Sequence, residues 1–230
     1  MLSLVTEISS NFDFNSLFLL AILVGLEAVL SADNAVALAS ISSNLADKKQ
    51  QRQALNLGLL IAFILRMGMI IAATWVIHFW QFELLGALYL LWLVFQYFTS
   101  GNEHESGELQ GPQYQSLWQV IPLIALTDLA FSLDSVTTAI AVSDKTWLIL
   151  TGATLGIVAL RFLAELFIGW LKEYKHLETA GYVTVGLVGL RLLMRVVIPQ
   201  IVVPEWAIVL SITALFVWGF SEKMTETLEQ

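Results

Sequence analysis

The sequence contains no cysteine, only three histidines, and few charged residues. The absence of cysteine excludes disulfides, thiolate metal sites and cysteine nucleophiles. Charged residues make up 13% of the chain, whereas a soluble domain carries about 25%. Basic residues do not cluster or alternate with aromatic residues, so no nucleic acid is expected as a partner. What remains is a chain of 230 residues of which 57% are hydrophobic.

Long apolar runs account for the missing charge. A bilayer-crossing helix needs roughly 20 apolar residues, and seven runs approach or exceed that length. The sequence therefore predicts an all-α membrane protein with seven transmembrane helices and the lipid bilayer as a partner. No enzyme is expected, because the chain has neither a His-Glu-x-x-His motif nor a Gly-x-Ser-x-Gly turn. The predicted spans are 16–43, 53–77, 82–100, 117–142, 146–171, 178–198 and 203–220.

Lysine and arginine are distributed unevenly between the two sides of this arrangement. With the N-terminus outside, six basic residues fall in the inner loops and two or three in the outer loops. Because cytoplasmic loops are enriched in basic residues, we expect an outside N-terminus and a cytoplasmic C-terminus. The inner residues are Lys48, Lys49, Arg52, Lys172, Lys175 and Lys223, and the outer ones are Lys145, Arg195 and, at a span end, Arg191.

An acidic motif occurs twice along the chain. The segment Glu27-Ala-Val-Leu-Ser31-Ala-Asp33-Asn34 recurs 101 residues later as Asp128-Leu-Ala-Phe-Ser132-Leu-Asp134-Ser135. Further along, Arg66 and Arg161, Glu83 and Glu178, and Gly86 and Gly181 are each 95 residues apart. The difference of six residues corresponds to a change in loop length, which a duplication tolerates.

This duplication predicts the domain organisation. Each copy has three spans, an odd number, so the second copy crosses the membrane in the opposite sense, as in many secondary transporters. We expect a first three-helix repeat at 1–100, an acidic loop at 101–116, a second, inverted repeat at 117–198, and a seventh span with a short cytoplasmic tail at 199–230.

Both motifs place acids inside spans. Inserting one charged side chain at the bilayer centre costs about 2.5–3.5 kcal/mol of free energy. On an ideal helix the first acid, the serine and the final Asn or Ser share one face, and the second Asp points about 120° away. Two explanations stay open. The helices are broken near Ser31 and Ser132, where Ser-x-Asp resembles an N-cap, or the second Asp faces a partner on another helix.

The motif residues offer only oxygen ligands, which suit hard divalent cations such as Mg(II), Ca(II) and Mn(II). The alternative is that these groups join helices by hydrogen bonds. Arg161 has Glu165 one turn later as an ion-pair partner, whereas Arg66 needs a partner on another span. The candidate metal ligands are Glu27, Asp33, Asn34, Asp128, Asp134 and Ser135, with Ser31, Ser132, Arg66 and Arg161 as supporting groups or counter-ions.

The two motifs, from Glu27 to Asn34 and from Thr127 to Ser135, together with the stretch from Glu178 to Leu190, resemble the TerC family of integral membrane proteins. The resemblance implies a seven-span bacterial or organellar membrane protein linked to tellurite resistance and manganese homeostasis. It also implies that the motif acids are Glu27, Asp33, Asp128 and Asp134 in this chain.

We therefore expect a divalent cation transporter in the plasma membrane of a bacterium, which exports Mn(II) by alternating access and is driven by protons. The cation is cargo, and no permanently bound cofactor is expected. The alternative is a membrane assembly or metalation factor that binds partner proteins without moving metal. Association with another membrane protein or with a second copy of the chain stays open.

Overall fold

The computed structural model describes residues 14–45, 47–72, 79–100, 114, 116–142, 145–200 and 203–224. Side chains are described for these residues except 14–17, 26–33, 100, 141–142 and 205. Within this part, the chain is all-α. Its helices are α2 (Phe14–Ser43), α3 (Lys48–Ile71), α5 (Trp80–Ser100), α6 (Leu117–Val142), α7 (Thr146–Trp170), α8 (Leu177–Val197) and α9 (Glu205–Gly219).

These helices correspond one to one with the predicted apolar runs. Five of them, α3, α5, α6, α7 and α8, are long and apolar enough to cross a membrane. The described parts of α2 and α9 contain the shorter apolar segments Asn34–Ser43 and Trp206–Gly219. Large apolar side chains such as Phe95, Phe162 and Trp118 are exposed on the outer faces. A protein surface of this kind is suited to contact with lipid.

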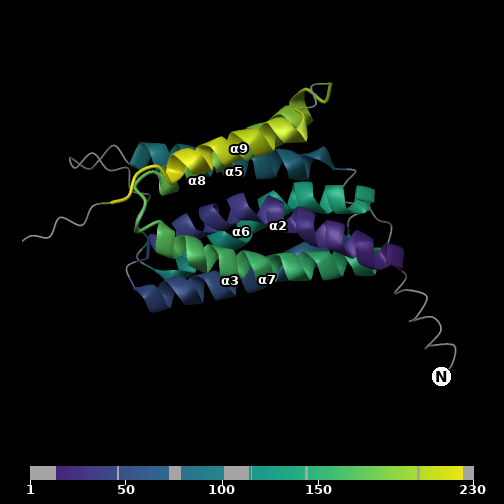
Figure 1. The fold of residues 1–230 in the computed structure, drawn as a ribbon, viewed down its shortest axis with the longest axis horizontal. Helices are drawn as coiled ribbons and strands as arrows, with labels where there is room; N and C mark the ends of the chain where they lie inside the picture. The colour runs from purple at the N-terminus through teal and green to yellow at the C-terminus, as the bar shows by residue number, and fades with distance from the viewer. Residues whose placement is uncertain are drawn as a thin grey trace, which may run out of the picture.

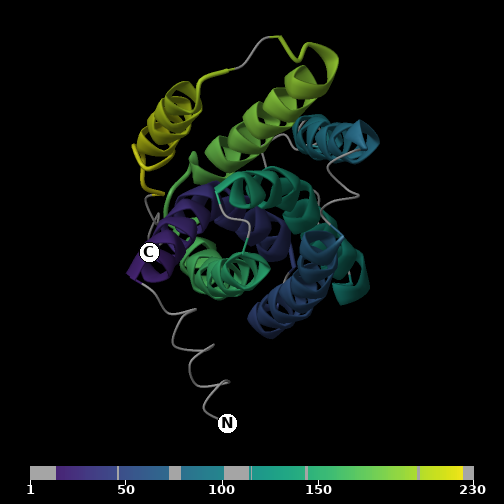
Figure 2. The ribbon, with the colours of Figure 1, turned by 90° about the vertical axis from the view of Figure 1, so that its right-hand side faces the viewer.

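The helices run roughly along the long axis of the molecule and form one bundle (Figure 1). Seen from the end, α2, α3, α6 and α7 form a cluster, and α5 and α8 lie beside it (Figure 2). The largest contact surfaces join α2 to α7, α3 to α6, and α5 to α8. Smaller contacts join α2 to α8 and α5 to α6, while α9 packs on α8.

The helix α3 begins earlier than the sequence suggested. The side chain of Asp47 accepts a hydrogen bond from the backbone N–H of Lys49 at 3.1 Å and caps the helix. The predicted start at residue 53 is wrong, because the polar residues from Lys48 onward already form the first turn of the helix. Arg52 therefore lies on α3, within reach of Glu165 on α7 at 2.8 Å.

The helix α6 is continuous through the second acidic motif, so of the two explanations that the sequence leaves open, a break near Ser132 does not hold. The Ser132 hydroxyl donates to the carbonyl of Asp128 at 2.6 Å, one turn earlier in the helix. Thr137 donates to the carbonyl of Leu133 in the same way, at 2.7 Å. These bonds satisfy the hydroxyls inside an intact helix. The backbone of α2 is likewise continuous past residue 31.

A small clasp joins the loop after α7 to the segment after α9. His176 donates to the Glu222 carboxylate at 2.9 Å and stacks on Trp218. This hydrogen bond, followed by the charge of Lys175, lowers the pKa of Glu222 below its ordinary value. This clasp and the contact between Arg52 and Glu165 join helices at the same end of the bundle. The basic residues at this end are Lys48, Lys49, Arg52, Lys172, Lys175 and Lys223.

The contact between α3 and α6 depends on a glycine. A Cβ atom at Gly58 would lie 2.5 Å from Cγ2 of Ile124 on α6, which is too close for any side chain. Gly68 on the same helix has no atom within 4 Å of that position and is exposed. The close approach of α3 and α6 therefore requires the absence of a side chain at residue 58.

We predict that Gly58→Ala destabilises the protein and that Gly68→Ala does not. Overpacking costs about 1–3 kcal/mol, which exceeds the gain of about 1 kcal/mol in helix propensity. Thermal unfolding in detergent should give a lower midpoint for Gly58→Ala than for the wild type. Equal midpoints for the two variants would contradict the described α3–α6 packing.

Candidate cation site

A buried ion pair joins α3 to α6 at the first acid of the second motif. Arg66 Nη2 lies 3.1 Å from Asp128 Oδ1. The arginine side chain is 1% exposed and the aspartate side chain 0%. Arg66 thus has the partner on another helix that its sequence context requires. A pair this deep is costly to break, because removal of one partner leaves an uncompensated charge.

One hydroxyl group of α6 contacts this ion pair, and a second hydrogen-bonded group begins at the next residue. Ser132 lies 3.3 Å from the second carboxylate oxygen of Asp128, one turn along the helix. Next to Asp128, Thr127 shares a hydrogen bond with the Tyr89 hydroxyl of α5 at 3.1 Å. Tyr89 in turn donates to the carbonyl of Leu123 at 3.1 Å. Asp128 is therefore enclosed by polar groups of α3 and α6, and the separate Thr127–Tyr89 hydrogen bond joins α6 to α5.

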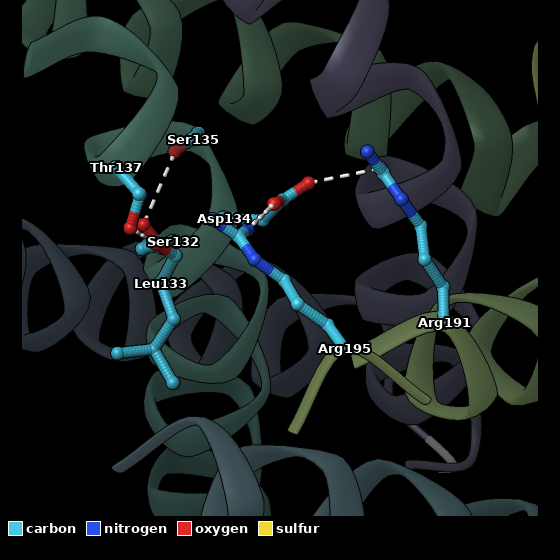
Figure 3. Close-up of polar contacts among 7 residues, drawn as sticks. All are labelled: Ser132, Leu133, Asp134, Ser135, Thr137, Arg191 and Arg195. Carbon is cyan, nitrogen blue, oxygen red and sulfur yellow. Dashed lines mark hydrogen bonds and ion pairs between the residues drawn. The ribbon is translucent and has the colours of Figure 1, made fainter. Parts of the chain in front are cut away.

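The second acid of the motif lies in a different environment. Arg191 donates to Asp134 Oδ2 at 2.9 Å, and Arg195 donates to Asp134 Oδ1 at 2.9 Å (Figure 3). Both arginines come from α8. We call Asp134, Arg191 and Arg195 the Asp134 clamp. Charge-assisted hydrogen bonds of this kind are stronger than neutral ones.

Asp128 and Asp134 point away from each other around α6. Their separation of six residues rotates the second side chain by about 120° relative to the first. Of the two explanations that the sequence left open, a partner on another helix holds for Asp134. Figure 3 shows Ser132, Ser135 and Thr137 on one side of α6 and the carboxylate of Asp134 directed to the other. Ser135 donates to the carbonyl of Ser132 at 3.3 Å.

Arg161 belongs to a separate network between α3 and α7. Its Nη1 lies 2.7 Å from Glu165, as the spacing of four residues predicts. Its Nε donates to the side-chain oxygen of Asn56, and Glu165 also contacts Arg52. Arg161 therefore has its own acid and does not contact Asp128 or Asp134 through these bonds.

The first motif is only partly described. Asn34 is buried in α2 at 5% exposure. Glu27, Ser31 and Asp33 lie along the α2 helix, but their side chains are outside the described residues. Among the side chains that are described, no three His, Asp or Glu groups lie close enough to hold a metal ion. The meeting of the two motifs in one site stays a prediction.

Sequence reasoning missed the role of Arg191 and Arg195. It placed Arg195 in an outer loop, whereas both arginines lie within α8 and contact Asp134. The signal was present, because two arginines four residues apart share one helix face. Arg161 is matched by Glu165, whereas Asp128 is paired with Arg66, and Asp134 with Arg191 and Arg195.

Residues 12–226, nearly the whole chain, match the family described as integral membrane protein TerC family. The chain belongs to the TerC family. As a member, it is a multi-pass integral membrane protein, in agreement with the apolar helices of the bundle. The residues 27–34 and 127–135, which suggested this family from the sequence, lie within the matched range.

The chain is similar to membrane proteins of Bacillus subtilis and Escherichia coli. It is 38% identical to the uncharacterized membrane protein YceF of Bacillus subtilis over 182 residues, which cover 76% of this chain and 70% of YceF. It is 33% identical to YkoY of the same organism over 192 residues, covering 76% of this chain and 59% of YkoY. It is 28% identical to the inner membrane protein YgdQ of Escherichia coli over 202 residues, which cover 80% of this chain and 83% of YgdQ. No solved structure matches the chain.

We predict that Arg66 and Asp128 are strongly coupled in stability. Arg66→Met or Asp128→Leu alone should cost about 3–5 kcal/mol, because each leaves a buried charge without its partner. The double variant should recover most of that loss. The measurement is the free energy of unfolding of all four proteins in mixed micelles.

A matched control for this cycle is Arg52→Met, which removes an arginine whose side chain is 67% exposed. Its ion pair with Glu165 should contribute less than about 1 kcal/mol. Additive losses for Arg66 and Asp128, with no recovery in the double variant, would show that the two side chains do not interact as described.

Proposed function

We propose that this protein is a divalent cation transporter that exports Mn(II) by alternating access. The observation that carries the proposal is the acidic centre on α6. Asp128 and Asp134 lie within one membrane-length helix and are compensated by arginines from two different helices, α3 and α8. Ionisable residues inside spans mark ion pathways by default, because they are costly to keep there.

The helix packing supports two inverted halves. If α2, α3 and α5 are exchanged with α6, α7 and α8, the α2–α7 contact becomes α6–α3, and the α2–α8 contact becomes α6–α5. Both members of each pair are present in the bundle. Such exchange symmetry is what a pseudo-two-fold axis between the halves produces, and transporters of this architecture bind cargo near the repeat interface.

Two glycines support the same exchange. A Cβ atom at Gly86 of α5 would lie 2.9 Å from Leu133 of α6, and one at Gly181 of α8 would lie 2.5 Å from Val36 of α2. These glycines are the pair that the sequence places 95 residues apart. In each half, the third helix thus approaches the first helix of the other half through the equivalent glycine.

The ligand chemistry favours a hard divalent cation. Carboxylates from Asp128 and Asp134, joined by Glu27 and Asp33 of α2, supply the negative charge. Hydroxyl and amide oxygens add neutral ligands, and sites of this kind bind Mn(II), Mg(II) or Ca(II). We assign Mn(II) as the cargo on the basis of the family resemblance. The neutral ligands are Ser31, Asn34, Ser132 and Ser135.

Orientation and energy supply complete the proposal. Basic residues gather at the bundle end that holds the Arg52–Glu165 contact and the His176–Glu222 clasp, and basic loops are cytoplasmic. The N-terminus is then outside, in the plasma membrane of a bacterium. Export of a divalent cation from a negative cytoplasm needs a driving force, and entry of two protons per cation makes the exchange electroneutral.

A membrane assembly or metalation factor is the second candidate. It is favoured by one observation, namely that Asp128 and Asp134 already have arginine partners and therefore also suit a purely structural role. In that case the acids join helices and the exposed apolar faces bind a partner protein. The two candidates differ in whether the purified protein alone moves metal.

We predict Mn(II) flux in proteoliposomes that contain only this protein, with Mn(II) inside and an imposed pH gradient. Asp134→Asn and Asp128→Asn should each lower the flux at least about tenfold, the equivalent of about 1.4 kcal/mol. Lys172→Gln, which removes an exposed charge in the loop after α7, is the matched control and should retain flux.

Folded protein that moves neither Mn(II), Mg(II) nor Ca(II) would refute the transporter and favour the assembly factor. Wild-type flux that persists in both Asn variants would refute the site while leaving transport intact. Size-exclusion profiles of each variant distinguish loss of function from loss of fold.

A further inference from the structure

The Asp134 clamp has a property that the buried pair at Asp128 lacks. We propose that Arg191 and Arg195 are a gate of the cation pathway: they occupy Asp134 when no cation is bound, and they must leave before Asp134 can bind one. This inference rests on the proposed transport function and adds to it two specific residues on α8.

Occupancy of the carboxylate is the first argument. Each oxygen of Asp134 accepts a hydrogen bond from a different guanidinium, both at 2.9 Å. A divalent cation ligated by this carboxylate would take the same oxygens and would stand beside two positive charges. Like charges at such short distances repel strongly, more so away from bulk water. Cation and arginines therefore compete for Asp134.

Accessibility is the second argument. The side chain of Asp134 is 14% exposed, that of Arg191 is 22% exposed and that of Arg195 is 46% exposed. A gate must be able to release its contacts, and long arginine side chains that are not sealed in the core can do so by rotation. The pair of Arg66 and Asp128 is sealed from the surface and lacks this freedom.

Position in the bundle is the third argument. The clamp bridges α6 to α8 without a large helix–helix contact, because α8 packs mainly on α5 and α9. Arg195 lies in the last turn of α8. The bridge between these helices therefore depends on side chains near a helix end, and it can open with little rearrangement of the core.

The clamp is also absent from the other half of the sequence. The shift of 95 residues that relates Gly86 to Gly181 relates Gln96 to Arg191 and Ser100 to Arg195. The first half thus has no positive charge at either position. Two inverted halves alone would give equivalent entrances, whereas a gate in one half makes the two sides of the membrane different.

Mn(II) binding tests the gate without relying on transport. Free Mn(II) gives a sharp paramagnetic resonance signal that weakens on binding, so the dissociation constant can be measured in detergent. We expect the double variant Arg191→Gln/Arg195→Gln to bind Mn(II) at least about tenfold more tightly than the wild type. Addition of Asp134→Asn should abolish the gain. Arg191→Lys/Arg195→Lys keeps the charges and should stay near the wild type, as should the control Lys172→Gln.

Access to the site gives an independent readout, because the chain has no native cysteine. Thr138 lies one turn from Asp134 and is partly buried. The variant Thr138→Cys should react with a membrane-impermeant thiol reagent. The reaction should be several-fold faster in the Arg191→Gln/Arg195→Gln background than in the protein that keeps both arginines.

The outcomes separate the two proposals. If the wild type binds Mn(II), and the Gln variant has the same dissociation constant and the same rate of thiol labelling in the Thr138→Cys background, the gate proposal is refuted. The proposed transport function is not affected by that result. Absence of Mn(II) binding from the wild type and all variants would refute the cation site, and the gate would fall with it. Binding only in the Gln variant would support the gate in its strongest form.

Discussion

A charge buried in an apolar bundle must be paired, and this constraint organises the molecule. Arg66 and Asp128 satisfy it across α3 and α6, whose close approach is allowed by Gly58. Because either residue alone would be an uncompensated charge, the pair fixes the rotation of both helices. The rotation of α6 then determines where the other side chains of its motif point. Ser132 lies next to Asp128, whereas Asp134 lies on a different face of the helix.

The two acids of one motif therefore have different roles in our account. Asp128 is enclosed, with polar contacts from Arg66 of α3 and Ser132 of α6. Asp134 is partly accessible and is held by side chains from α8 that can be displaced. A transporter needs both properties, since a site must be kept inside the bilayer and must also be able to open. Because Asp128 and Asp134 are six residues apart on one helix, a single short motif places one acid in the enclosed environment and the other in the accessible one.

Much of the fold follows from the sequence, because long apolar runs are strong signals of membrane-length helices. The ends of α6 at 117 and 142 were predicted correctly, whereas the start of α3 was missed because its first turn is polar. The N-cap interpretation of Ser132 failed because a hydroxyl can also bond back within an intact helix. The spacing of Arg191 and Arg195 indicates a shared helix face, but not that Asp134 is their partner, since pairing between helices depends on rotations that no local pattern specifies.

The central claim is that Asp134 and acids of the first motif bind a divalent cation inside the bundle. The most direct test is a structure of the protein soaked in Mn(II), with the metal located by its anomalous scattering. Our account predicts a peak within direct ligand distance of the Asp134 carboxylate, shared with acids of α2 and accompanied by displacement of Arg191 and Arg195. Mn(II) found only at surface carboxylates such as Glu222, with the Asp134 clamp unchanged at saturating metal, would contradict it.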